Sequence, residues 1–76
     1  MADAEWDVRE DATWYHVTAR GTCPRCGAVF EERSQRRRVA GPPDTPPLEV
    51  REAADGMIEL AAQGSFLPIA LHRCEG

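Results

Sequence analysis

The feature that most constrains the fold is a pair of short cysteine-containing segments about fifty residues apart. Cys23 and Cys26 lie in the segment CPRCG, and His72 and Cys74 lie in the segment HRCEG. Two cysteines separated by two residues in a tight turn direct both thiols inward, and residues two apart on a strand point to one face. Each segment therefore presents two donor groups together, as expected of a metal site that joins distant parts of a chain.

The length of the chain makes such a site energetically important. With 76 residues, the chain forms one small domain. A core of this size supplies only about 3–5 kcal/mol, whereas a bound structural metal adds on the order of 10 kcal/mol. The chain has three cysteines, and this odd number is untypical of a disulfide framework.

The two pairs together give three sulfur donors and one nitrogen donor in a closed tetrahedral set, which is typical of structural sites. Zinc is the expected ion, and iron is the alternative. We favour His72 as the fourth ligand. The alternatives are a group from a partner, a water molecule, or His16, which lies seven residues before Cys23. An extended strand of that length spans about 23 Å, too far for His16 to reach the metal unless the strand folds back.

Residue patterns predict a mainly antiparallel β domain. Residues 13–20 and 28–34 are rich in β-branched and aromatic side chains, which indicates two strands with CPRCG in the turn between them. Residues 48–64 fit two structures equally well: one helix near 47–62, or a hairpin that turns at Asp55-Gly56. Residues 65–74 read as a buried strand, in which Pro68 indicates an edge or a bulge.

The expected organisation is simple. Residues 1–12 are polar and acidic and predict a flexible arm, and residues 13–76 predict a single domain. Within it, residues 35–47 combine a run of arginines with four prolines, which predicts an exposed loop.

The segment CPRCG between two strands, followed much later by a ligand pair after another strand, resembles a zinc ribbon. The resemblance covers about residues 14–33 and 66–74, and a histidine-x-cysteine pair stands where a ribbon commonly has a second C-x-x-C. It implies a small metal-stabilised antiparallel β fold with one structural Zn²⁺. It implies no particular activity, because such ribbons serve many functions.

The sequence contains no recognisable catalytic set, so we expect a non-enzymatic module that acts as an accessory subunit or adaptor for a larger protein. Arg36–Arg38, Trp6 and Trp14 are the candidate partner-binding residues, although we favour the interpretation that both tryptophans cover the core. The alternative is a nucleic-acid-binding ribbon that uses Arg36–Arg38. A redox protein that uses Cys23 and Cys26 is a weaker alternative, because such pairs usually precede a helix.

The net charge and the N-terminal segment indicate which partners and which cellular compartment to expect. The formal net charge is −4, which disfavours a general nucleic-acid coat or a membrane-surface binder. All basic side chains except the histidines are arginines, as in a GC-rich bacterial genome. The segment MADAEWDVRED lacks the basic and apolar pattern of a signal peptide, so we expect a cytoplasmic protein.

Overall fold

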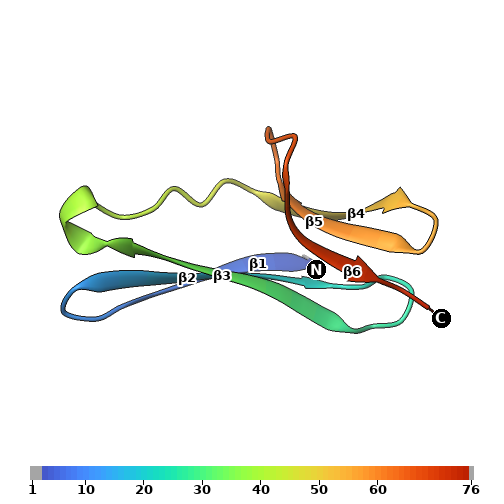
Figure 1. Ribbon diagram of the computed structural model, residues 1–76, viewed down its shortest axis with the longest axis horizontal. Coiled ribbons are helices and arrows are strands. Elements are labelled where there is room, and N and C mark those ends of the chain that lie inside the picture. The colour runs from blue at the N-terminus through green and yellow to red at the C-terminus, as the bar shows by residue number, and fades with distance from the viewer. Residues whose placement is uncertain (1–2, 76) are drawn as a thin grey trace.

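Six strands and one short 3₁₀ helix make up the computed structural model, which describes residues 3–75 (Figure 1). The strands are β1 (Ala4–Glu10), β2 (Trp14–Thr22), β3 (Val29–Arg37), β4 (Leu48–Ala54), β5 (Met57–Ala62) and β6 (Pro68–Arg73), and the 3₁₀ helix η1 is Arg38–Ala40. Among the described residues, no helix has the length and apolar character needed to cross a membrane.

The strands form two antiparallel sheets of three strands each, with the orders β1-β2-β3 and β4-β5-β6. The predicted mainly antiparallel β fold is therefore confirmed, and so is the hairpin of β2 and β3 that carries CPRCG in its turn. The alternative of a helix near 47–62 is wrong, because β4 and β5 form a hairpin that turns at Asp55-Gly56. Gly56 has φ +75°, a backbone conformation that glycine adopts without steric cost.

Most of the described part of the expected flexible arm at residues 1–12 forms strand β1, while residues 1–2 lie outside the described residues. β1 pairs with β2 along its whole length, and Trp6 and Val8 lie opposite Ala19 and Val17. Asp11 closes the turn, since its Oδ1 accepts hydrogen bonds from the backbone N–H groups of Thr13 and Trp14 at 2.8 and 2.7 Å. Apolar and charged residues alternate in β1, which is the pattern of a half-buried strand. The acidic composition of the segment made this pattern hard to recognise in the sequence.

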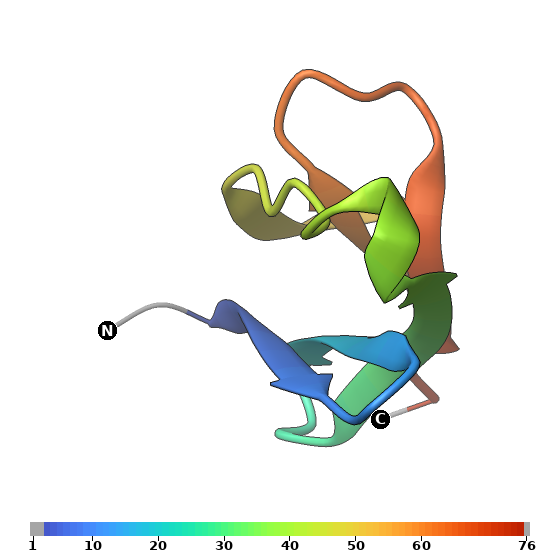
Figure 2. The same cartoon turned by 90° about the vertical axis from the view of Figure 1, so that its left-hand side faces the viewer.

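The two sheets face each other, with β3 beside β6 and β1 beside β4 (Figures 1 and 2). Ala19, Leu60 and Ala70 are buried between them, and partly buried apolar side chains such as Trp6 and Phe30 pack against this cluster. A second buried cluster contains Cys23, Ile58 and Cys74. The core is small, and two of the three cysteines belong to it.

Gly21 allows the two sheets to approach each other closely. A Cβ at this position would lie 2.9 Å from Val50 Cγ2, 3.2 Å from Leu60 Cδ1 and 3.3 Å from Phe30 Cζ. The first of these distances is shorter than van der Waals contact allows, so even one methyl group would force the sheets or the side chains apart.

Gly21→Ala is therefore expected to lower the free energy of unfolding by about 1–3 kcal/mol, measured by urea denaturation in the presence of zinc. The Val50→Ala background provides the control, because it removes the nearest atom. In that background Gly21→Ala should cost clearly less, as a double-mutant cycle reports. Equal costs in both backgrounds would show that the contact with Val50 does not determine the spacing of the sheets.

Candidate metal centre

The turn between β2 and β3 is closed by its own backbone. The N–H of Cys23 donates to Ala28 O at 2.8 Å, and the N–H of Gly27 donates to Cys23 O at 2.9 Å. Gly27 has φ +75°, which a residue with a Cβ adopts only with strain. Cys23 is buried and Cys26 is exposed. The turn therefore holds one thiol against the core and the other at the surface.

The second donor pair comes from the end of β6. His72 lies opposite Ile58 of β5, on the side of the sheet that faces β3. Its ring stacks on the ring of Phe30, with centroids 5.3 Å apart and an interplanar angle of 18°. The backbone N–H of Cys74 donates to Gly56 O at 2.7 Å, so the turn between β4 and β5 fixes this cysteine.

These two pairs meet at one end of the molecule. One donor atom each from Cys23, Cys26, His72 and Cys74 lies within 4.8 Å of all the others. Cys26 Sγ and His72 Nε2 are 3.3 Å apart. Around a tetrahedral zinc ion, neighbouring sulfur and nitrogen donors are about 3.6–3.8 Å apart, given metal–ligand bonds of about 2.0–2.3 Å. The four residues therefore form a group that could hold one metal ion after small side-chain adjustments.

The electrostatics of the thiols suit a cation. Burial raises the pKa of Cys23, but N–H groups of Cys26 and Arg25 and the side chains of Cys26 and Cys74 outweigh it and lower this pKa to about 6. The N–H of Ala28 lowers the pKa of Cys26, but the Cys23 side chain, burial and Cys74 outweigh it, so this pKa is raised. Ionisation of one thiol thus opposes ionisation of its neighbour, and a bound cation removes that opposition.

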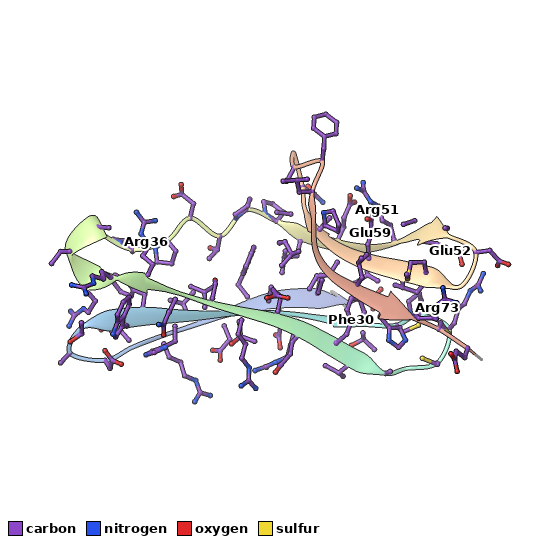
Figure 3. All side chains as sticks on the ribbon, viewed as in Figure 1. Phe30, Arg36, Arg51, Glu52, Glu59 and Arg73 are labelled. Carbon is purple, nitrogen blue, oxygen red and sulfur yellow. The ribbon has the colours of Figure 1, made fainter. Side chains whose placement is uncertain are left out.

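Two contacts that the sequence did not predict position the turn against the second sheet. Arg25 Nη2 in the turn lies 2.6 Å from Glu52 Oε1 in β4. The Phe30 ring stacks on the His72 ring and also packs against both buried clusters. Figure 3 shows Phe30 and Glu52 at the end of the molecule where the sulfur atoms lie. Phe30 lies opposite Gly21 in the β2–β3 pairing.

His16, the competing nitrogen donor, is engaged elsewhere. Its Nε2 lies 2.7 Å from Asp11 Oδ2 at the turn between β1 and β2. This hydrogen bond, with those from the backbone of Thr13 and Trp14, lowers the pKa of Asp11 to about 2. Among the described residues, His16 is not part of the group of donors at Cys23.

The three arginines of the run, which precede the proline-rich segment, contact the chain itself. β3 continues through Arg37, so the loop predicted at 35–47 begins later than expected. Arg36 Nη2 donates to Ala40 O at 3.0 Å, and Arg38 Nη1 donates to Asp11 O at 3.0 Å. The Arg37 guanidinium lies 5.2 Å from the centroid of the Trp14 ring. Arg36 thus contacts η1, Arg37 covers its cross-strand partner Trp14, and Arg38 joins η1 to the turn between β1 and β2.

The two tryptophans have different surroundings. Trp6 is partly buried against the core, and its Nε1 donates to Pro46 O. Trp14 is half-buried and is covered by Arg37. The structure brings neither ring to the metal centre. Trp6 joins β1 to the proline-rich loop.

The comparisons do not assign the chain to a family. Searches against family models, curated proteins and solved structures find no match. The donor group and the two-sheet fold therefore carry the functional argument alone.

Proposed function

We propose that this chain is a non-enzymatic zinc-binding module, related in its architecture to zinc ribbons, that serves as an accessory subunit or adaptor for a larger protein. The observation that carries the proposal is the meeting of Cys23, Cys26, His72 and Cys74, whose donor atoms lie within 4.8 Å of one another. The ion would connect the β2–β3 turn to the end of β6.

Zinc is the ion that this donor set favours. Three thiolates and one imidazole are among the commonest ligands of structural zinc, and the filled d shell of zinc imposes no competing geometry. A site of thiolates also accepts iron, so the ion must be identified by analysis. Thiolates persist in a reducing compartment, which supports the proposed cytoplasmic location.

The closed donor set supports a structural role. Four protein ligands leave no coordination position for substrate or water, whereas catalytic zinc sites keep one open. The ion would also compensate for a small core, in which the largest fully buried side chains of the described residues are Ile58, Leu60 and Cys23. A stable small scaffold with mixed surface charge suits recognition of another protein.

The nucleic-acid alternative has weaker support because Arg36 and Arg38 donate hydrogen bonds to backbone carbonyl groups of this chain, and Arg37 covers Trp14. The two functions differ in their dependence on salt. Binding to phosphates weakens linearly in log salt, with a slope set by the number of contacts. Tight binding of an oligonucleotide with that slope would contradict the adaptor proposal.

Removal of the imidazole at position 72 tests the ligand assignment. His72→Ala should retain zinc at least tenfold more weakly than the unmodified protein in competition with a chromophoric chelator, because one of four bonds is lost. His16→Ala is the matched control, since its ring lies against Asp11, and it should retain zinc normally. Equal weakening by both substitutions would remove His72 from the site.

A further inference from the structure

The three cysteines of the donor group differ in their access to solvent. Cys23 is 1% exposed and Cys74 is 8% exposed, whereas Cys26 is exposed. Cys26 lies in the turn between β2 and β3, directly after Pro24 and Arg25, which are exposed as well. A small molecule that arrives from solvent therefore meets the sulfur of Cys26 before that of either buried cysteine.

A metal at this site would leave the Cys26 sulfur reactive toward oxidants. A thiol that coordinates a cation is deprotonated, and the thiolate is the form that oxidants attack. A second thiolate within reach is needed for the product to be a disulfide. The donor atoms of Cys23, Cys26 and Cys74 lie within 4.8 Å of one another. A sulfur–sulfur bond of about 2.05 Å can therefore form by side-chain rotation with small shifts of the turn.

Cys23 is better placed than Cys74 to form this bond. Its N–H donates to Ala28 O and its carbonyl accepts from the N–H of Gly27, so it belongs to the same closed turn as Cys26. Cys74 is held at the second sheet, where its N–H donates to Gly56 O. A bond between Cys23 and Cys26 closes a short ring within one turn, which costs less entropy than a ring that joins the two sheets.

We propose that Cys26 is an oxidation site through which a peroxide releases the metal. The Cys26 thiolate attacks one oxygen of hydrogen peroxide, the O–O bond breaks, hydroxide leaves, and Cys26 becomes a sulfenic acid. The Cys23 thiolate then attacks the Cys26 sulfur, so that an S–S bond forms, the S–O bond breaks and a second hydroxide leaves. The two thiolates lose two electrons, the peroxide gains them, and both hydroxides take protons from the solvent.

The disulfide would remove the connection between the two sheets. Only His72 and Cys74 would remain as donors, and a structural zinc ion requires four. The ion would therefore leave, and the β2–β3 turn would separate from the end of β6. Exchange with a small thiol restores both cysteines, so the change is reversible. This inference rests on the proposed zinc site and adds a means of regulating the adaptor.

The experiment treats the unmodified protein with hydrogen peroxide after metal analysis has shown one zinc per chain. A chromophoric chelator reports the release of zinc, the remaining thiols are alkylated, and tryptic peptides are identified by mass spectrometry. Trypsin cleaves after arginine, which places each cysteine on its own peptide: residues 21–25, residues 26–33, and the peptide that begins at residue 74. Each disulfide is therefore identified without ambiguity.

Zinc release should follow the same time course as a disulfide between peptides 21–25 and 26–33, while Cys74 stays available for alkylation. Dithiothreitol and zinc together should restore the metal-bound protein. Cys26→His and Cys74→His form a matched pair, because each keeps four potential ligands and removes one thiol. Cys26→His should release zinc at least about tenfold more slowly than the unmodified protein, and Cys74→His within about threefold of it.

A first disulfide that includes Cys74, zinc release without any disulfide, or retention of zinc under peroxide would overturn this inference and leave the zinc site intact. Equal rates for the two histidine variants would overturn it as well. If Cys26→His does not retain zinc, the peptide map of the unmodified protein alone decides. Protein that contains no zinc before peroxide is added would instead contradict the proposed function itself.

Discussion

Removal of the metal by a chelator at neutral pH is expected to unfold the protein. A structural metal at the proposed site would contribute on the order of 10 kcal/mol, whereas a core of this size supplies about 3–5 kcal/mol. Cys23 and Cys74 also pack with Ile58, so loss of the ion would leave thiols in mutual contact inside the smaller of the two core clusters. Far-ultraviolet circular dichroism should lose its β signal on addition of excess EDTA, and tryptophan emission should shift to the red.

Restoration of the signal by a stoichiometric amount of zinc is the necessary control, since it separates metal loss from irreversible damage. Cys74→Ser should reproduce the effect without chelator, because a hydroxyl replaces one of three thiolates. A protein that keeps its spectrum and its unfolding temperature in EDTA would contradict the structural role of the metal.

Leu60→Ala is expected to lower the free energy of unfolding of the metal-bound protein by about 2–5 kcal/mol. The Leu60 side chain is fully buried between the sheets, where it packs with Ala19 and Ala70. These small neighbours cannot fill the space left by the isobutyl group, so a cavity would remain. Urea denaturation in saturating zinc measures the change.

Leu71→Ala provides the matched control, because Leu71 lies on the neighbouring strand β6 but is 55% exposed. It should change the free energy of unfolding by no more than about 0.5 kcal/mol. Similar losses for the two variants would mean that Leu60 does not lie in the principal core.

The cluster of Cys23, Cys26, His72 and Cys74 could be predicted from the sequence because it depends on local geometry. The spacing of Cys23 and Cys26 requires a tight turn, and the spacing of His72 and Cys74 requires only that residues two apart on an extended strand share a face. The spacing of these residues does not reveal which other side chains hold the site in place. The stacking of Phe30 on His72 and the contact of Arg25 with Glu52 depend on how the two sheets pack.

The fold was harder to predict wherever local preferences conflicted with tertiary pairing. In residues 48–62 helical spacing and a turn at Asp55-Gly56 were equally good local patterns, and the pairing of Ile58 with His72 favours the strand. Strand β1 was not predicted because its outward positions are charged. Its pairing with β2 stabilises it through backbone hydrogen bonds, and composition does not reveal such pairing. The sequence of the arginine run likewise does not reveal that Arg36 and Arg38 donate hydrogen bonds to Ala40 O and Asp11 O, and its role in partner binding stays a prediction.

X-ray absorption at the zinc edge of the purified protein tests the central claim most directly, because it reports the ligands of the ion itself. The proposed site predicts one zinc per chain with three sulfur atoms at about 2.3 Å and one nitrogen atom at about 2.0–2.1 Å. His72→Ala should remove the imidazole scattering and leave the sulfur shell. Protein that contains no zinc, or zinc bound mainly by oxygen, would contradict a site built from Cys23, Cys26, His72 and Cys74.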